Sequence, residues 1–497
     1  MILITEGNVN IYYLQTLCLL FFPGQKFSPD EVETENTPVV RVSLRETESG
    51  VEAECLMRVG KKEKTAQHTE LFADYPEKEK CGKIAMGVAI FEAGKKLLSF
   101  SPPWGILTGV RPAKVVAQMA AEGMDYTSIR RRLTKEYFLN SKKASLAINV
   151  SRFEQKVLKK IPPNSCSLYI SIPFCPSRCS YCSFVSYSTK KLFSLLPEYL
   201  DRLCADIART CKLIDSLGLR LYTIYIGGGT PTILEPEQLK RLLDTVCENT
   251  DVSSLAEFSL EAGRPDTITP EKMKIAVEHG IGRVSVNTQT LSDQILAEIG
   301  RNHTAADYYR AFEIVRESGV RCINTDLIAG LPGESFTLFS RSVDGVISLR
   351  PENLTVHTFC VKRAASILQT DGDIFNRSSA DTVKGVDYSQ IQAKLAGYQP
   401  YYMYRQKNTS GNLENVGFSL EGYEGLYNIL IMEEVHSIFA CGAGGVTKLV
   451  RKSGIEMQRF FMPKYPFEYL AFSSDREKSD AFYRSLEEYE AETKRLS

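Results

Sequence analysis

Hydrophobic and polar positions alternate with two different periods through the middle of the chain. Six short apolar runs cover residues 168–172, 221–226, 257–261, 283–288, 322–327 and 354–359. Amphipathic stretches of helical period lie between them, near residues 195–216, 236–248, 271–280, 303–318 and 336–348. Short buried strands that alternate with helices are typical of βα units around a parallel sheet. The pattern predicts an α/β fold in which six such units form a partial (β/α)6 barrel.

The chain on either side of this region has other patterns. Residues 40–55 alternate around a turn at 48–50, which predicts a β-hairpin, and a helical pattern in several pieces covers about 113–157. The Lys- and Glu-rich stretch 61–82 is typical of a solvated loop or helix face. We expect three regions: an N-terminal α/β domain of unknown role at 1–160, the barrel at 161–380, and a mixed substrate-side domain at 381–497.

Composition narrows the classes of function. Lysine plus arginine and aspartate plus glutamate each number 60, so net charge provides no attraction to nucleic acid or anionic membranes. An odd count of thirteen cysteines, without a recognisable secretory signal, does not indicate a disulfide framework. The apolar run LCLLFF near the start is too short to span a membrane. These features predict a soluble cytoplasmic protein with no nucleic-acid or membrane partner.

The predicted strands end in residues that carry chemistry. Strand one leads into IPFCPSRCSYC, which spaces three thiols as C-x3-C-x2-C, and strand two ends in the glycine triplet 227–229 followed by Thr230 and Pro231. The later strands carry or end near four polar residues: Glu261, Gln289, Asp326 and His357. Because the carboxyl ends of barrel strands form one mouth, we expect these groups to lie together.

Three cysteines this close suit a zinc site, disulfide exchange or an iron–sulfur cluster. Structural zinc sites usually pair two C-x2-C units or add histidines, and the sequence has no second C-x2-C unit. A cubane cluster tolerates tighter, irregular spacing of its thiolates. Three thiolates leave one of its irons open for a substrate or cosubstrate. The spacing favours a cluster, with zinc or structural cysteines as the alternative.

The other candidates have structural interpretations as well. A glycine triplet also suits a tight strand-to-helix turn, and a lone carboxylate at a strand end is often a helix cap. Their occurrence on successive strands favours a shell of ligand-binding groups.

Together the motifs resemble the radical S-adenosylmethionine (SAM) superfamily. CPSRCSYC after one strand and GGGTPT after the next carry the likeness. EFSLEAGRPDTIT, RVSVNTQTL and NTDLIAGLPGES narrow it to the oxygen-independent coproporphyrinogen III oxidase family, also called coproporphyrinogen dehydrogenases. WGILTGVRPAK and YYMYRQKNTSGNLENVGF resemble the variant of that family with an extra N-terminal region.

The resemblance implies cofactors and their ligands. A [4Fe–4S] cluster would be held by Cys175, Cys179 and Cys182. Tyr169, Gly228 and Glu261 would belong to the first SAM site. In the best-known oxidase a second SAM lies beside the first, so the resemblance leaves open whether this chain binds one SAM or two. The positions assigned to the two sites are Tyr181, Gly229, Thr230, Gln289, Arg301 and Asp326.

The implied activity is an oxidoreductase reaction of haem (porphyrin) biosynthesis. A 5′-deoxyadenosyl radical would drive the anaerobic oxidative decarboxylation of two propionates of coproporphyrinogen III to vinyl groups, giving protoporphyrinogen IX. The implied electron donor is a reduced flavodoxin or a ferredoxin-like protein. The four substrate carboxylates need cations, for which the candidates are Lys362, Arg363, Arg405 and Lys407.

Two positions depart from the oxidase pattern. Ser171 stands where the best-known oxidases have His, and Phe184 stands where they have a further Cys. Phe184 resembles the related haem chaperones, which share the cluster. A haem-binding chaperone on the same scaffold is therefore the alternative function, and a radical SAM enzyme with another substrate is a third.

Overall fold

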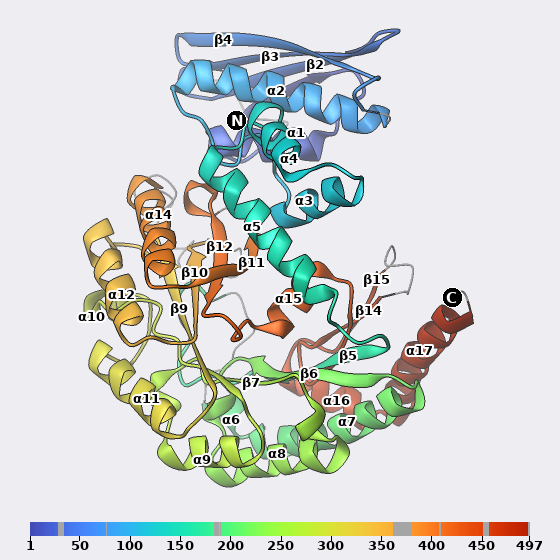
Figure 1. Cartoon of the computed structure of the whole chain (residues 1–497), viewed down its shortest axis with the longest axis vertical. Coiled ribbons are helices and arrows are strands. Elements are labelled where there is room, and N and C mark those ends of the chain that lie inside the picture. The colour runs from blue at the N-terminus through green and yellow to red at the C-terminus, as the bar shows by residue number, and fades with distance from the viewer. Residues whose placement is uncertain are drawn as a thin grey trace. The chain divides into compact units, whose positions relative to one another are not determined.

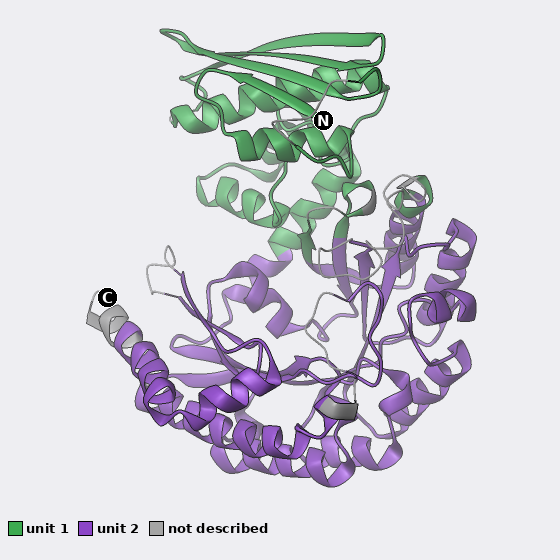
Figure 2. Cartoon of the chain, turned by 180° about the vertical axis from the view of Figure 1, so that it is seen from behind, with its two compact units in different colours: residues 1–152, 372–383, 403–414 green, residues 153–371, 384–402, 415–497 purple. Residues whose placement is uncertain are grey.

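A computed structural model describes most of the chain, namely residues 1–27, 34–75, 77–182, 188, 190–360, 379–406, 409–450 and 457–495. The chain divides into two units (Figure 2). Unit 1 comprises residues 1–152, 372–383 and 403–414, and unit 2 comprises residues 153–371, 384–402 and 415–497. The domain boundaries at 160 and 380 stay a prediction.

Unit 1 contains a four-stranded sheet in the order β1-β2-β3-β4. β1 (Ile2–Glu6) pairs in parallel with β2 (Val39–Glu46), and β3 (Gly50–Val59) and β4 (Lys62–Leu71) follow antiparallel. The predicted hairpin is confirmed by the pairing of β2 with β3. The expectation of a solvated loop or helix face at 61–82 is wrong for residues 62–71, which form β4, whereas a helix begins at Lys78. β4 is an edge strand, so its charged side chains stay in solvent and only Ala66 is buried.

Helices complete unit 1: α1 (Ile11–Phe21), α2 (Lys78–Leu98), α3 (Pro112–Ala121), α4 (Tyr126–Lys135) and most of α5 (Ser141–Leu158). α2 packs on β3 and β4, as Figure 1 shows. Its Gly94 permits close contact with α1, because a Cβ there would lie 2.6 Å from the Phe21 ring. The predicted helical stretch at 113–157 is thus three helices.

Residues 403–414 bring a buried ion pair into unit 1. Lys143 Nζ lies 2.6 Å from Glu414 Oε1, and Trp104 Nε1 donates to Glu414 Oε2 at 2.8 Å. Arg405 lies over the Trp104 ring and donates to the backbone carbonyl of Leu107. Only 4% of Arg405 is exposed. These contacts contradict its interpretation as a substrate-binding cation.

Unit 2 is built on six neighbouring parallel strands: β5 (Ser165–Ile172), β6 (Arg220–Gly228), β7 (Glu257–Glu261), β8 (Arg283–Ser285), β9 (Cys322–Ala329) and β10 (Asn353–Thr358). Both faces of these strands are largely buried, as is usual for parallel sheets. The predicted α/β fold with a parallel sheet is confirmed.

Helices line the outer face of these strands (Figure 1): α7 (Leu196–Ser216), α8 (Pro236–Asn249), α9 (Pro270–Glu278), α10 (Asp293–Glu298), α11 (Ala305–Glu317) and α12 (Phe336–Ser348). The short α6 (Lys190–Phe193) precedes α7. Capping boxes define two of the starts, with Glu235 and Gln238 at α8 and Thr304 and Asp307 at α11.

Later strands extend the same sheet to eleven, in the order β11-β12-β10-β9-β8-β7-β6-β5-β13-β14-β15. They are β11 (Gln399–Arg405), β12 (Glu414–Ser419), β13 (Ser437–Cys441), β14 (Val446–Val450) and β15 (Met457–Phe461). β12 pairs antiparallel with β10, and β13 pairs in parallel with β5. The remaining helices are α14 (Ser379–Leu395), α15 (Leu426–Glu433), α16 (Pro466–Ser474) and α17 (Arg476–Arg495).

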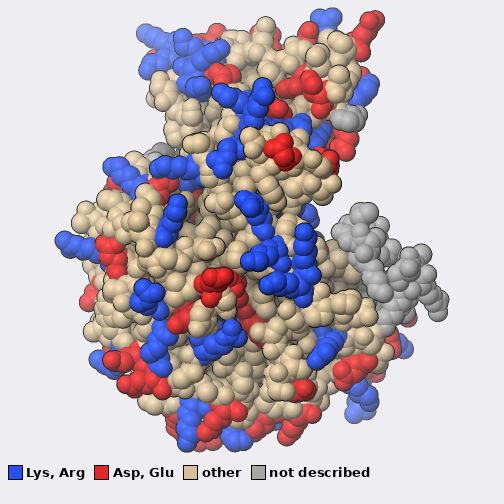
Figure 3. Space-filling model, in the orientation of Figure 1, with Lys and Arg blue, Asp and Glu red and all other residues tan. Residues whose placement is uncertain are grey.

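The described residues include no helix that is long and apolar enough to cross a membrane. Acidic and basic side chains are interspersed on the face shown in Figure 3, in keeping with the balanced composition.

Candidate functional site

The cysteine loop after β5 packs against the glycine triplet 227–229 at the carboxyl end of β6. Gly229 N donates to the Ile172 carbonyl at 2.7 Å, and Thr230 N donates to the Phe174 carbonyl at 2.8 Å. A Cβ on Gly229 would lie 2.6 Å from that Phe174 oxygen, so only glycine permits this approach. The triplet therefore fixes the position of the cysteine loop. In addition, Thr230 Oγ1 donates to Cys175 Sγ at 3.3 Å.

The three cysteines lie at the carboxyl edge of the sheet. Cys175 and Cys179 are buried and Cys182 is partly exposed, and Cys182 N donates to the Cys179 carbonyl at 3.1 Å. Across the described ranges, no three His, Cys, Asp or Glu side chains converge as one metal ion would require. The thiolates of a cubane bind different irons, so they need not converge on one point.

Tyr181 and Arg301 lie beside Cys179. Burial raises the pKa of Tyr181, and Arg301 opposes that rise. Burial lowers the pKa of Arg301, but its interactions with Tyr181 and Cys179 outweigh this effect and raise it above its ordinary value. Arg301 also donates to the backbone carbonyls of Gly263 and Asn287. The guanidinium is therefore a permanent buried cation at the cysteine loop.

Two carboxylates face each other across the strand ends. Burial, and then the charge of Asp326, raise the pKa of Glu261 to about 8, although the Gly228 backbone donates to it. Burial also acts to raise the pKa of Asp326, but His357 and Asn324 hold it below its ordinary value. The Asp326 Oδ2 to His357 Nε2 distance is 3.6 Å. The two carboxylates Glu261 and Asp326 would favour a cationic ligand, such as the sulfonium and ammonium groups of SAM.

Gln289 shows the signs of a ligand contact. Its φ of +73° lies in the left-handed region, and its backbone N donates to the Asp326 carbonyl at 3.0 Å. Its Oε1 is buried and has no hydrogen-bond partner within the described part of the chain. Strained backbone and an unsatisfied buried acceptor are both unfavourable, and they gather at sites that bind ligands. A donor on the ligand would satisfy this oxygen.

Tyr169 belongs to a stack of three tyrosines. Its ring centroid lies 6.1 Å from that of Tyr225 on β6 and 6.2 Å from that of Tyr427 on α15, and the Tyr225 and Tyr427 centroids are 4.7 Å apart. Interplanar angles of 16° to 22° define a stacked arrangement. The charge of Glu261 adds to the rise that burial causes in the pKa of Tyr169, so the two side chains are neighbours. The stack therefore holds the Tyr169 ring beside Glu261.

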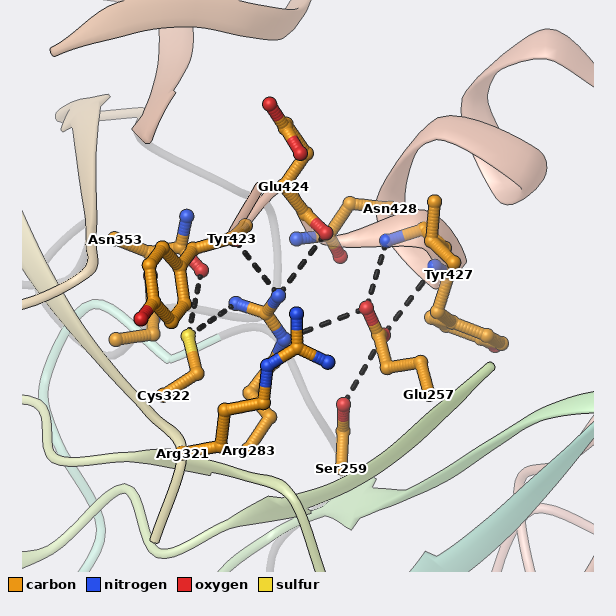
Figure 4. Close-up of polar contacts among 12 residues, drawn as sticks. Glu257, Ser259, Arg283, Arg321, Cys322, Asn353, Tyr423, Glu424, Tyr427 and Asn428 are labelled. Atoms are coloured by element: carbon orange, nitrogen blue, oxygen red, sulfur yellow. Dashed lines mark hydrogen bonds and ion pairs between the residues drawn. The ribbon is translucent and has the colours of Figure 1, made fainter. Parts of the chain in front are cut away.

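The opposite, amino edge of the strands holds a separate polar cluster (Figure 4). Glu257 accepts from the backbone N of Leu426 at 2.7 Å and of Tyr427 at 3.3 Å, at the start of α15. Arg283 Nε lies 3.4 Å from Glu257 Oε2, and Arg283 also donates to the Tyr423 and Glu424 carbonyls. These contacts anchor the segment that carries Tyr427 into the tyrosine stack.

Comparison with known proteins identifies the family. Residues 169–341 match the radical SAM superfamily model. The oxygen-independent coproporphyrinogen-III oxidase-like protein HemZ of Bacillus subtilis is 35% identical over 412 residues, which cover 81% of this chain and 82% of that protein. The chain belongs to the radical SAM, oxygen-independent coproporphyrinogen-III oxidase-like family. Radical SAM proteins use a [4Fe–4S] cluster and SAM, so both predicted cofactors are confirmed.

Two further proteins are similar to the chain. The haem chaperone HemW of Bacillus subtilis is 40% identical over 197 residues, which cover 39% of this chain and 51% of HemW. The solved coproporphyrinogen III oxidase HemN of Escherichia coli aligns with a TM-score of 0.51 at 21% identity. That alignment covers 66% of this chain and 72% of HemN, and it supports the fold.

The structure brings most of the predicted site residues into neighbouring groups. Thr230 donates to Cys175, and Tyr181 and Arg301 interact with Cys179. Glu261 interacts with Gly228, Tyr169 and Asp326. Their roles toward the cofactors stay predictions. Four residues lie outside the described part of the chain: Phe184, Lys362, Arg363 and Lys407.

Sequence reasoning missed three neighbours of the site. Tyr225 lies in an apolar strand run, where a tyrosine indicates only burial. Tyr427 is more than 250 residues from Tyr169 along the chain, and no local pattern predicts their contact. Arg264 lies within the motif EAGRPDTIT, and its contact with the cysteine loop depends on tertiary structure.

Ser171, the departure from the oxidase pattern, donates to the Ala443 carbonyl at 2.8 Å.

Proposed function

We propose that the chain catalyses the anaerobic oxidative decarboxylation of coproporphyrinogen III to protoporphyrinogen IX. The supporting observation is the grouping of the cysteine loop, the glycine triplet and the Glu261–Asp326 pair at one edge of the parallel strands. The relation to HemZ over most of both chains supports the porphyrinogen as substrate.

The proposed division of tasks follows from the contacts. Cys175, Cys179 and Cys182 would hold the cluster, and the unsatisfied Gln289 oxygen with the Glu261–Asp326 pair would hold the cationic part of SAM. When bound, the cluster and SAM supply the radical that removes a hydrogen atom from a propionate side chain. The protein must orient the reacting groups and exclude water. Burial of Cys175, Cys179 and Gln289 is consistent with a dry site.

A haem chaperone is the second candidate function. The 40% identity to HemW over 197 residues favours it, since this is higher than the 35% identity to HemZ, although it covers a shorter stretch. A chaperone would bind haem without converting coproporphyrinogen.

One anaerobic assay separates the two functions. The reconstituted protein is incubated with SAM, a strong reductant and coproporphyrinogen III, and the products are measured by mass spectrometry. The proposal predicts 5′-deoxyadenosine together with mono- and divinyl products. Unchanged coproporphyrinogen, with haem binding seen as a Soret band, would establish the chaperone function instead.

Cys179→Ala and Cys204→Ala form a matched pair of variants for this assay. Cys204 is a buried residue on α7, outside the cysteine loop. The oxidase proposal predicts no vinyl product from Cys179→Ala and near-normal product from Cys204→Ala. Equal conversion by both variants would contradict the assignment of the cysteine loop.

A further inference from the structure

Arg264 is a buried arginine that donates hydrogen bonds to the cysteine loop. It follows Gly263, just beyond the carboxyl end of β7, and only 3% of it is exposed. Its Nη1 donates to the Ser177 carbonyl at 3.3 Å and its Nη2 donates to Ser177 Oγ at 3.0 Å. Ser177 lies between Cys175 and Cys179, so both contacts hold the loop that spaces these two thiols.

The same guanidinium touches a thiol directly. Arg264 Nη1 donates to Cys179 Sγ at 3.8 Å, within the longer range usual for sulfur acceptors. Arg301 also interacts with Cys179, so two buried cations share one thiol. On the far side, Arg264 Nε lies 3.2 Å from Asp266 Oδ1, and the Asp266 side chain is 27% exposed. One partly solvated carboxylate balances Arg264, and Arg301 adds a second positive charge.

His303 contributes no charge to this group. It is 3% exposed, and neither of its ring nitrogens has a hydrogen-bond partner within the described ranges. Burial lowers its pKa to about 3, and the nearby charges of Arg301 and Arg264 add to this effect. Arg264 and Arg301 are therefore the cations of this group near neutral pH.

We propose that Arg264 raises the reduction potential of the cluster by donating to the Cys179 thiolate and placing a buried positive charge beside it. Reduction adds one electron to the cluster, which makes it one unit more negative. A fixed cation stabilises the reduced form more than the oxidised form. Hydrogen bonds to cluster sulfurs and local charge are established determinants of such potentials.

An arginine suits this task better than a lysine. Its planar fork donates in several fixed directions at once, here to the Ser177 carbonyl, Ser177 Oγ and Cys179 Sγ. A lysine ammonium keeps the charge but cannot reproduce this set of directions. The two effects of Arg264, on charge and on loop geometry, are therefore separable by substitution.

The inference rests on the proposed cluster ligands and requires no porphyrinogen. The test is an anaerobic redox titration of the reconstituted full-length protein, in which electron paramagnetic resonance measures the reduced cluster. Iron and sulfide analysis normalises each sample. The variants are Arg264→Gln, Arg264→Lys and Asp266→Asn. Arg310→Gln is the matched control, since Arg310 is an exposed arginine that also pairs with an aspartate, Asp307.

Each variant has an expected direction. For Arg264→Gln we expect the equilibrium constant for reduction to fall about tenfold, which is a 59 mV lower midpoint for one electron. Arg264→Lys should lie between Arg264→Gln and the wild type. Asp266→Asn should raise the midpoint, because it removes the counter-charge of Arg264. Arg310→Gln should match the wild type.

Two outcomes would overturn the role of Arg264. The first is a cluster-loaded Arg264→Gln protein with the wild-type midpoint. If Arg264→Gln does not assemble a cluster, Asp266→Asn decides, and an unchanged or lower midpoint there contradicts the proposal. A wild-type protein that assembles no cluster would instead contradict the cluster ligands, so the two failures are distinguishable.

Discussion

Strand β7 has a glutamate at each end, and the two differ in how the protein satisfies them. Glu257, at the amino end, accepts from two backbone N–H groups of α15 and from Ser259 Oγ, and it pairs with Arg283 (Figure 4). Glu261, at the carboxyl end, has the Gly228 backbone as its donor and Asp326 as a charged neighbour. Its pKa is raised to about 8, chiefly by burial.

The difference indicates that the amino end of β7 stabilises the fold, whereas the carboxyl end is suited to binding a ligand. At the amino edge the protein provides the donors and the counter-charge, as expected for a structural ion pair. At the carboxyl edge, the raised pKa of Glu261 and the unsatisfied Gln289 oxygen fit the proposed SAM site, where the ligand would supply a donor and positive charge. In barrel folds, residues at the amino-terminal ends of the strands usually serve stability, and those at the carboxyl ends serve catalysis.

The largest expected effect comes from breaking the Glu257 pair. Glu257→Ala would leave Arg283 buried without its counter-charge and α15 without its N-terminal acceptor. Loss of one partner of a buried pair typically destabilises by about 3–5 kcal/mol. Urea unfolding of the apo-protein measures the change, with the exposed Glu237→Ala as control. Equal stability of the two variants would contradict the structural role of Glu257.

A smaller effect is expected on SAM binding at the other end of β7. Glu261→Gln keeps the shape of the side chain but cannot ionise when the SAM cation binds beside it. Hydrogen bonds to charged groups contribute about 1.5–3 kcal/mol, so SAM affinity should fall roughly tenfold or more. Isothermal titration of the cluster-loaded protein provides the measurement. Unchanged affinity would remove Glu261 from the proposed SAM site.

The raised pKa of Glu261 also predicts a pH dependence of stability. Its pKa of about 8 in the folded protein exceeds its ordinary value of 4.5, so the folded state binds the proton more tightly. The resulting stability is fully present below pH 4.5 and is lost as pH rises through about 8. The wild type should lose up to about 1.4 kcal/mol per pH unit more than Glu261→Gln over this range.

Apo-protein unfolding between pH 5 and 9 measures this difference, because other titrating groups are common to both proteins. Parallel pH profiles of the wild type and Glu261→Gln would show that Glu261 ionises normally.

The smallest effect concerns the tyrosine stack that joins the two edges. Stacked aromatic pairs contribute about 0.5–1.5 kcal/mol beyond burial of their area. A double-mutant cycle of Tyr225→Leu and Tyr427→Leu, read by apo-protein unfolding, should give a coupling energy in this range. Additive effects would mean that the 4.7 Å contact contributes no specific interaction.

Local patterns predicted the parts of the molecule that depend on local physics. The six parallel strands follow from short apolar runs, and α8 and α11 follow from the amphipathic stretches near 236–248 and 303–318. The cysteine spacing and the glycine triplet indicated one site, because both follow strands whose carboxyl ends form one mouth.

Contacts between distant segments were beyond such patterns. β13 pairs with β5 although some 270 residues separate them, and neither run indicates the partner of the other. β4 was missed because an edge strand with one buried residue has the composition of a loop. The hydrogen bonds from Arg264 to Ser177 and Cys179 join the loop after β7 to the loop after β5, and these loops come together only in the folded sheet.

The most direct test of the carboxyl-edge site is the reductive cleavage of SAM. The reconstituted wild type, Cys179→Ala and Cys204→Ala are incubated anaerobically with SAM and dithionite, and 5′-deoxyadenosine is measured by mass spectrometry. We expect 5′-deoxyadenosine to form with the wild type and Cys204→Ala and not to form with Cys179→Ala. Cleavage by Cys179→Ala at the wild-type rate, or no cleavage by a cluster-loaded wild type, would contradict it.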